Sequence, residues 1–130
     1  MDEVAREGVA FTRAYCSDSP CMPSRAALFS GRLGIKNGVV THWGPGSEMR
    51  FPGWGHIYET RQPMLMRLLR QNGWDTVSFS SFADRHQAFW FTAGWSELHT
   101  FTLKGGSEDA NEVNAAALPW LMARPWTDCA

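Results

Sequence analysis

Short segments with extended and helical hydrophobic patterns follow one another along this chain. Val9, Phe11 and Tyr15 fall on one face of residues 9–15, with small residues on the other face, and this alternation predicts a strand. A charged helix should precede the strand and end at Gly8. The order of elements is that of an α/β protein.

A helix and then a second strand are expected in the middle of the chain. Leu65, Leu68 and Leu69 repeat at helical spacing, and Gly73 can adopt the left-handed conformation that ends a helix. A strand is expected to follow over residues 74–79.

The remaining segments predict a loop and a final helix. Residues 33–55 are rich in glycine and proline, which indicates mostly loop. A helix is expected over residues 107–122, with Ser107 as its N-cap and with Pro119 bending or shortening it. The adjacent acids Glu108 and Asp109 suit the first turn of that helix, so we read them as a helix start and not as a metal site.

Composition narrows the classes of function. The chain has 130 residues, 44% of them hydrophobic, which is enough for one domain. A net charge of −1 argues against nucleic acid or an anionic membrane as a partner. No apolar run approaches the ~20 residues of a membrane span. The charged start, residues 1–7, does not resemble a signal peptide, which leaves the compartment open and favours the cytoplasm if Met1 is the natural start.

Residues 21–32 carry most of the candidate chemistry. Pro23 is tolerated in a first helical turn, and Gly31 can end the helix that follows. Cys21 therefore sits where free backbone N–H groups and the positive end of a helix dipole form an anion site. Arg25 lies about one turn further on, within reach of the same anion.

Other interpretations of Cys21 have less support. A lone cysteine is commonly a small buried hydrophobic residue. Cysteine-dependent phosphatases need a longer spacing between cysteine and arginine than the three residues found here. A zinc site would require paired cysteines, whereas Cys16 lies five positions before Cys21 and Cys129 has no local partner.

The sequence CMPSRAALFSGR at 21–32 resembles the C-x-P-S-R signature of type I sulfatases, in the alkaline phosphatase superfamily. EGVAFTRAY at 7–15 and the segment 63–76 are similar to that family's flanking strand and following helix. The resemblance implies an alkaline-phosphatase-like α/β fold, a mixed sheet flanked by helices, of which only an N-terminal portion is present. We expect residues 1–130 to be a partial catalytic domain that is inactive alone, without the family's first strand, its paired aspartates and its C-terminal part.

The resemblance also implies a chemistry. Cys21, Pro23, Ser24 and Arg25 form the maturation motif, which a formylglycine-generating enzyme or an anaerobic maturase binds as an extended segment. Cys21 becomes formylglycine, whose hydrate is the nucleophile and a ligand of Ca²⁺ or Mg²⁺; the other metal ligands are expected outside this chain. Arg25 stabilises the hydrate, and the substrate is a sulfated small molecule or carbohydrate.

The chain departs from the family after the strand at 74–79. The family's Gly-Lys-x-His is replaced by residues 80–83, which read SSFA. Arg85 and His86 follow closely and are candidate substrate-binding residues, since arginine can hold a sulfate and histidine can donate a proton. Loop or helix-cap roles remain open for both.

Other residues have weaker functional assignments. Asn37 lies where the family often has a titratable histidine. The histidines at 42, 56 and 99 are expected in loops without identifiable partners. The aromatic run at 89–95 could form a platform for a sugar ring, but aromatic side chains more often build cores or sheltered loops.

The sequence therefore predicts a sulfuric ester hydrolase. The alternatives are a phosphonate monoester or phosphodiester hydrolase of the same fold, and an inactive fragment or pseudoenzyme with only a binding role.

Overall fold

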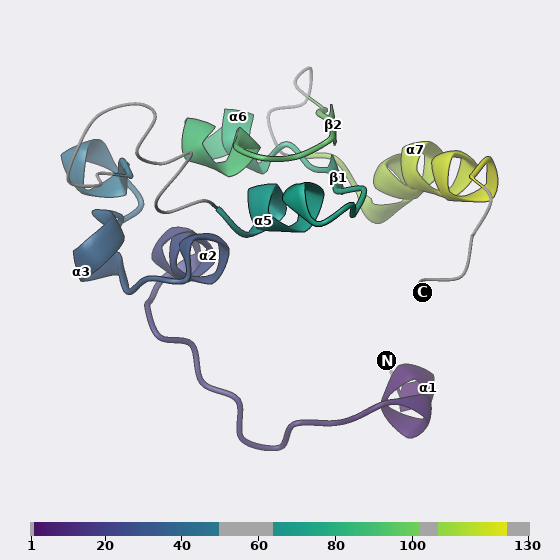
Figure 1. Ribbon diagram of the computed structural model, residues 1–130, viewed down its shortest axis with the longest axis horizontal. Helices are drawn as coiled ribbons and strands as arrows, with labels where there is room; N and C mark the ends of the chain where they lie inside the picture. The colour runs from purple at the N-terminus through teal and green to yellow at the C-terminus, as the bar shows by residue number, and fades with distance from the viewer. Residues whose placement is uncertain (1, 50–63, 102–106, 125–130) are drawn as a thin grey trace.

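The computed structural model describes residues 2–49, 64–101 and 107–124 (Figure 1). Its helices are α1 (Asp2–Glu7), α2 (Cys21–Ser30), α3 (Gly34–Asn37), α5 (Leu65–Gln71), α6 (Phe82–His86) and α7 (Ala110–Met122). Two short 3₁₀ helices, η1 (Gly44–Ser47) and η2 (Phe89–Thr92), and two strands, β1 (Val77–Phe79) and β2 (Glu97–His99), complete the described elements. No helix among these residues is long and apolar enough to cross a membrane.

The two strands form a small parallel sheet. Val77 pairs with Glu97 and Phe79 with His99, and α6 and η2 make the crossover between the strands. The backbone N–H of Ser80 extends the ladder by donating to the carbonyl of His99 (3.0 Å). A parallel pair joined through helices confirms the α/β class expected from the alternating pattern.

Helix α7 is fixed to one end of this sheet by a polar cluster. The indole N–H of Trp120 donates to Oε2 of Glu97 (2.8 Å). Arg124 forms ion pairs with Glu97 and with Asp75, the latter at 2.9 Å, and its guanidinium lies over the Trp120 ring at 4.0 Å. His99 stacks on Phe79, with ring centroids 4.4 Å apart.

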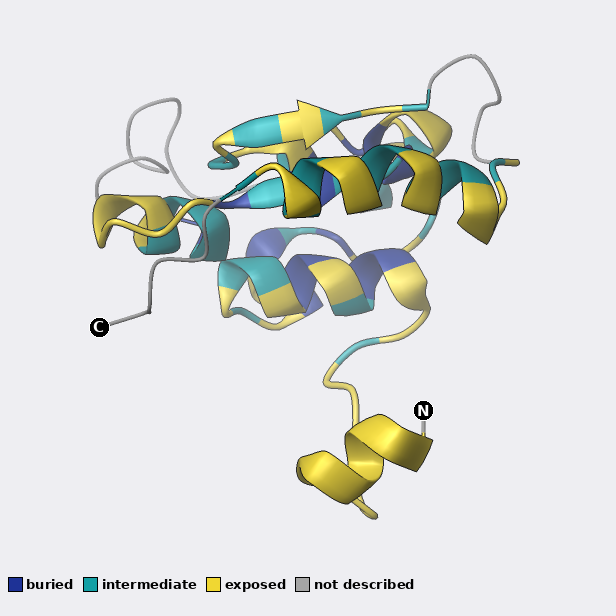
Figure 2. Ribbon diagram, turned by 90° about the vertical axis from the view of Figure 1, so that its right-hand side faces the viewer, coloured by how far each residue is buried: buried dark blue, intermediate teal, exposed yellow. Residues whose placement is uncertain are grey.

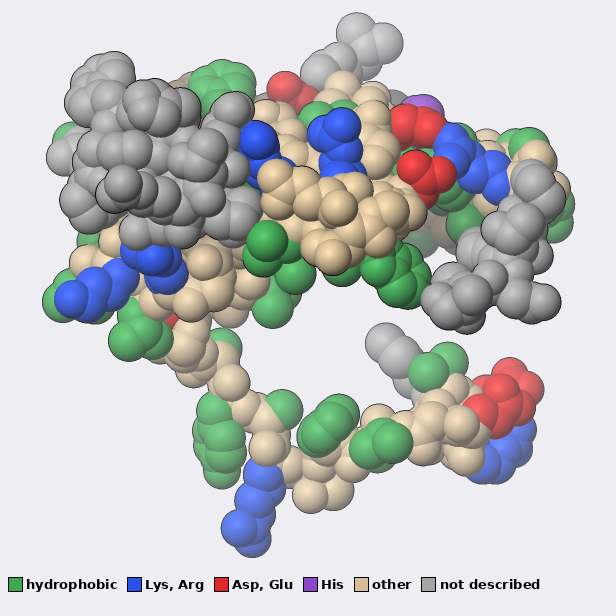
Figure 3. All heavy atoms as spheres, viewed as in Figure 1, with side chains coloured by type: hydrophobic (Ala, Val, Ile, Leu, Met, Phe, Trp, Pro, Cys, Tyr) green, Lys and Arg blue, Asp and Glu red, His purple; other side chains and the backbone are tan. Residues whose placement is uncertain are grey.

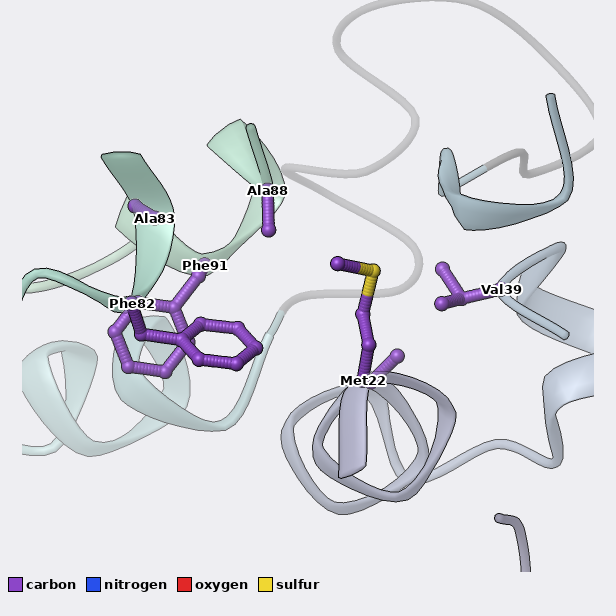
Figure 4. Packing of buried hydrophobic residues seen from close by; sticks show 7 residues of the cluster. Met22, Val39, Phe82, Ala83, Ala88 and Phe91 are labelled. Carbon is purple, nitrogen blue, oxygen red and sulfur yellow. The ribbon is translucent and has the colours of Figure 1, made fainter. Parts of the chain in front are cut away.

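The hydrophobic core lies between α2 and the α6–η2 crossover. Met22 rises from α2 toward Ala88, with Val39 on its other side, and Phe82 and Phe91 lie against each other beyond it (Figure 4). Figure 2 shows the buried face of α2 turned toward the sheet and its exposed face turned away. Because Met22 is the second residue of α2, the core fixes the very start of that helix.

The predicted helices are confirmed with shifted boundaries. Helix α2 begins at Cys21, not at Pro23, and ends at Gly31, which is left-handed as expected (φ 65°). Helix α7 starts later than predicted, because Asp109 and not Ser107 is the N-cap. The Asp109 carboxylate accepts from the backbone N–H of Glu112, and the Glu112 carboxylate accepts from the backbone N–H of Asp109. These two hydrogen bonds form a capping box that fixes the first turn. Pro119 is accommodated, and the helix continues to Met122.

The expected strand over residues 9–15 is absent. These residues are irregular, with Val9, Phe11 and Tyr15 78%, 81% and 88% exposed, so the alternating pattern has no sheet partner among the described residues. Helix α1 and this segment project from the remainder, and hydrophobic side chains stand along the segment (Figures 1 and 3). A strand needs a neighbouring backbone for its hydrogen bonds, which is why the pattern alone does not produce one.

The second strand is shorter than predicted, and the expected loop contains some helix. The strand begins at Val77, because Thr76 instead bonds to the Gly94–Ser96 turn. Within the predicted loop, α3 and η1 are single turns, and residues 50–55 lie outside the described residues.

Candidate active site

The candidate site is built on the first residue of α2. Cys21 is exposed there, preceded by Pro20 in extended conformation as the N-cap. The helix is ten residues long, so its N-terminal backbone N–H groups and dipole favour an anion beside Cys21. The expected position of Cys21 at a helix N-terminus is therefore found in the structure.

His42 is the direct neighbour of Cys21. Its Nε2 lies 3.0 Å from Sγ of Cys21, and the backbone N–H of Met22 donates to the same nitrogen at 3.4 Å. Since a backbone N–H can only donate, Nε2 is the acceptor in both contacts, and the ring proton of neutral His42 lies on Nδ1. A thiol or hydroxyl at position 21 thus faces a hydrogen-bond acceptor.

The prediction that His42 has no partner was wrong. Twenty-one residues separate it from Cys21, and no periodicity relates a loop residue to a helix start at that separation. The loop reaches the site because it is closed on itself: the N–H groups of Val40 and Thr41 both donate to the carbonyl of Gly46 (2.7 and 3.1 Å).

Arg25 extends from α2 toward α6. Its Cζ lies 4.8 Å from the centroid of the Phe82 ring, within the range of a cation–π contact. The Phe82 ring also lies 4.8 Å from that of His86, centroid to centroid. Ser24 is half-buried and Pro23 fully buried, so these two residues of the motif serve the helix and its packing.

Arg85 and His86 lie in the last turn of α6 and approach the site from the opposite side. The ring of His86 is 5.4 Å from that of His42, centroid to centroid. Burial is the main cause that lowers the pKa of His86, and electrostatic interactions with His42 and with two arginines lower it further. The two arginines are Arg85 and Arg25, so the charges of both act on His86. Cys21 is linked to this group through His42.

A polar pocket of about 210 Å³ opens beside His42. It lies between the 42–48 loop and the end of α6, and its lining residues are His42, Trp43, Gly44, Ser47, Glu48, Arg85, His86 and Gln87. His42 therefore lies between this pocket and the sulfur of Cys21. Of the lining residues, only Arg85 and His86 were predicted to belong to the site.

The other sequence candidates have structural roles. Asn37 is fully buried and accepts from the N–H of Val39 while donating to Ser30 and Arg32. His99 lies in β2 and bonds Glu97 (3.3 Å), so the expectation of a loop residue without a partner was wrong for it as well. In the aromatic run 89–95, Phe91 is a core residue, and His56 lies outside the described residues.

The described residues do not form a metal site by themselves. No group of three or more His, Cys, Asp or Glu side chains is brought together within residues 2–49, 64–101 and 107–124. Cys21 and its neighbour His42 supply sulfur and nitrogen, whereas Ca²⁺ and Mg²⁺ prefer oxygen ligands. We therefore derive no chemical step through a metal ion.

Comparisons with known proteins agree with the motif. A family model described as Sulfatase matches residues 1–110. Arylsulfatase G of Mus musculus is 38% identical over 77 residues, 59% of this chain and 13% of that protein. N-acetylgalactosamine-6-sulfatase of Homo sapiens is 49% identical over 41 residues, 32% of this chain and 8% of that protein. An ulvan-active sulfatase of Formosa agariphila is 37% identical over 51 residues, 38% of this chain and 10% of that protein.

The matched region is thus a small part of each relative, 8 to 13% of its length. No solved structure gave a significant match to the structure of this chain.

Proposed function

Because this chain belongs to the sulfatase family, we propose that the protein is a sulfuric ester hydrolase whose nucleophile is residue 21. The observation that carries the proposal is the position of Cys21: it is exposed at the start of α2, 3.0 Å from His42 and one turn before Arg25. The names of the relatives, an arylsulfatase, a hexosamine sulfatase and an ulvan-active sulfatase, support a sulfated aryl or carbohydrate substrate.

The proposal includes conversion of Cys21 to formylglycine by a formylglycine-generating enzyme or an anaerobic maturase. A hydrated aldehyde supplies two hydroxyl groups, one to attack sulfur and one to expel sulfate afterwards. Ca²⁺ or Mg²⁺ belongs to the same expectation, together with the alkaline-phosphatase-like fold of the family. The described residues contribute the protein groups around position 21, namely Arg25 and the start of α2, Arg85 and His86 of α6, and His42.

Arg25 and the start of α2 bind the negative charge. The guanidinium and the N-terminal N–H groups are fixed before substrate arrives, so they stabilise oxygens that gain charge in the transition state without reorganisation. Arg85, on the opposite side, is suited to clamp the sulfate oxygens in place of the family's lysine.

His86 is suited to bind rather than to protonate the substrate. Its lowered pKa keeps the imidazole uncharged near neutral pH, so it can donate or accept a hydrogen bond there but holds no readily lost proton. This differs from the proton-donor role considered from the sequence. His42, as an acceptor, orients the group at position 21.

The test is hydrolysis of 4-nitrophenyl sulfate by the full-length protein, co-produced with a formylglycine-generating enzyme. We expect turnover that is abolished in Cys21→Ala and unaffected in Cys16→Ala, because only Cys21 lies in the motif. A preference for a phenylphosphonate monoester over the sulfate would instead support the phosphonate hydrolase. Full activity in Cys21→Ala would refute the proposal.

A further inference from the structure

The proposed roles of the nucleophile and of the sulfate-binding arginines do not account for the pocket beside His42. It extends away from Cys21, from His42 along the 42–48 loop and the end of α6. His42 contacts Cys21 and also lines the pocket, so the pocket adjoins the site at which the sulfate of an ester would bind. The pocket is therefore placed to hold what the sulfate is attached to.

Trp43 is the distinctive residue of the pocket. Its side chain is 74% exposed, although the indole is large and apolar. Its ring centroid lies 6.2 Å from that of His42 and 6.4 Å from that of His86. An exposed indole beside a pocket is a surface available for stacking.

The loop that carries Trp43 is held in shape by its own hydrogen bonds. The Thr41 hydroxyl donates to the carbonyl of Trp43 (2.7 Å), and the Ser47 hydroxyl donates to that of Gly44 (2.8 Å). Gly44 is in the left-handed region (φ 65°), which permits this tight turn. Little ordering is then required when a ligand stacks on the indole.

The rest of the lining decides between a flat aromatic group and a sugar. Among the described residues that line the pocket, all but Trp43 and Gly44 have polar side chains. The edge of an aryl group carries only C–H bonds. It would remove these polar side chains from water without replacing their hydrogen bonds to water, so its binding would be unfavourable. A sugar ring has an apolar C–H face for the indole and hydroxyls around its edge for the polar groups. Ser47, Glu48 and Gln87 supply donors and acceptors for them.

The size of the pocket limits the ligand to one ring. At about 210 Å³ it is smaller than the roughly 300–1,000 Å³ of sites for drug-sized ligands. Resting on the proposed sulfatase function, we propose that residues 42–48 and 85–87 form the subsite for a single sugar ring bearing the sulfate. Trp43 is its stacking platform and the residue that selects a saturated ring over an aryl group.

Ligand binding to the full-length protein, produced without a formylglycine-generating enzyme so that Cys21 stays a thiol, tests this without turnover. The protein is labelled with 5-fluorotryptophan, and the Trp43 resonance is assigned from its loss in Trp43→Phe. The probes are a 6-sulfated hexose, the same hexose without sulfate, 4-nitrophenyl sulfate and inorganic sulfate. We expect the sulfated hexose to shift the Trp43 signal and to bind more tightly than inorganic sulfate.

Three variants distinguish the subsite from the sulfate site. Trp43→Ala should weaken binding of the sulfated hexose about fivefold or more and leave inorganic sulfate unchanged, while Trp43→Phe retains most of the affinity. Trp74→Ala is the matched control, because Trp74 is also exposed (53%) but does not line the pocket. Arg25→Ala should weaken every sulfate-bearing probe.

The outcomes separate the two proposals. If inorganic sulfate binds in an Arg25-dependent manner but Trp43→Ala leaves the sulfated hexose unaffected, the sugar subsite is wrong and the proposed function stands. A larger loss for 4-nitrophenyl sulfate than for the hexose in Trp43→Ala also overturns the subsite. If no sulfate-bearing probe binds, or Arg25→Ala changes none of them, the failure lies with the proposed function.

Discussion

The guanidinium of Arg25 lies over the ring of the buried Phe82, 4.8 Å from its centroid. The two residues come from different helices, α2 and α6, and the same ring contacts His86. Phe82 stands in the segment 80–83, which reads SSFA and directly precedes the segment of Arg85 and His86. One apolar residue thus orients a predicted catalytic group and a predicted binding group together.

Substituting this ring should separate its positioning role from its packing role. Phe82→Leu keeps a similar apolar volume but removes the cation–π contact, whereas Phe91→Leu alters the same core without a described contact to Arg25. We expect both variants to lose about 1–2 kcal/mol of unfolding free energy. Only Phe82→Leu should lower the affinity for sulfate. The affinities are measured by calorimetric titration at a temperature where both variants remain folded. Equal sulfate affinities in the two variants would contradict the positioning role.

The two arginines should respond differently to substitution by lysine. Arg25→Lys keeps the charge but loses the planar fork, and the loss of one such donor costs on the order of 3 kcal/mol, a hundredfold or more in kcat. Loss of Arg85 should raise KM as well as lower kcat, and Arg85→Lys should be the milder change, because lysine is the residue that the sulfatase resemblance leads us to expect there. Steady-state kinetics of the matured full-length protein measure both. An Arg85→Ala variant with unchanged kcat and KM would remove Arg85 from the site.

Maturation should distinguish two cysteines that are both exposed. Cys21 is followed by the Pro23 and Arg25 of the motif, whereas Cys16 is not. After co-production with a formylglycine-generating enzyme, peptide mass mapping should find the aldehyde at Cys21 and a thiol at Cys16. Thiol alone at Cys21, under conditions that convert a control sulfatase, would exclude the modification.

Much of the site could be read from the sequence because its central part is local. Cys21, Pro23 and Arg25 lie within two turns of one helix, whose end at Gly31 is set by backbone conformation. Their spacing alone therefore fixes their arrangement. The helix begins at Cys21, two residues before Pro23, and Pro23 lies in its first turn.

The rest of the site depends on contacts between distant segments. His42 and Trp43 reach it through a loop whose path is set by hydrogen bonds to Gly46, and hydrophobic periodicity carries no information about such a path. The prediction of a strand at 9–15 was wrong for the opposite reason. Its pattern was clear, but pairing depends on a neighbouring backbone that the pattern does not specify.

Asn37 should prove important for stability and not for catalysis. It is fully buried, and its amide satisfies the N–H of Val39 and the carbonyl of Arg32. Asn37→Ala leaves these groups without partners, so we expect a loss of about 2–4 kcal/mol in urea unfolding. Asn111→Ala, at an exposed position, should change the unfolding free energy by under about 0.5 kcal/mol. A stable Asn37→Ala protein would show that the loop after α3 does not need this anchor.

The attachment of α7 should weaken in acid. The hydrogen bond from Trp120 is the main cause that lowers the pKa of Glu97 from its ordinary value of 4.5, with His99 and Arg124 contributing. As the pH falls, Glu97 of the unfolded chain is therefore protonated before Glu97 of the folded chain. Ionised Glu97 stabilises the fold above pH 4.5, and this contribution is lost as the pH falls through the lower pKa of the folded state. Urea midpoints of the native chain should fall more steeply below pH 4.5 than those of Glu97→Gln. Parallel curves for the two proteins would contradict this linkage.

The burial of Met22 and Pro23 inside the first turn of α2 has a consequence for the order of events during synthesis. An oxidising enzyme that must bind the motif as an extended strand cannot do so once Met22 has entered the core beside Val39 and Ala88. Folding and oxidation therefore compete for the same nascent chain, and a molecule that folds first keeps its thiol for as long as it stays folded. The converted fraction would then report a ratio of two rates, so slowing the ribosome or destabilising the core around Met22 should raise it.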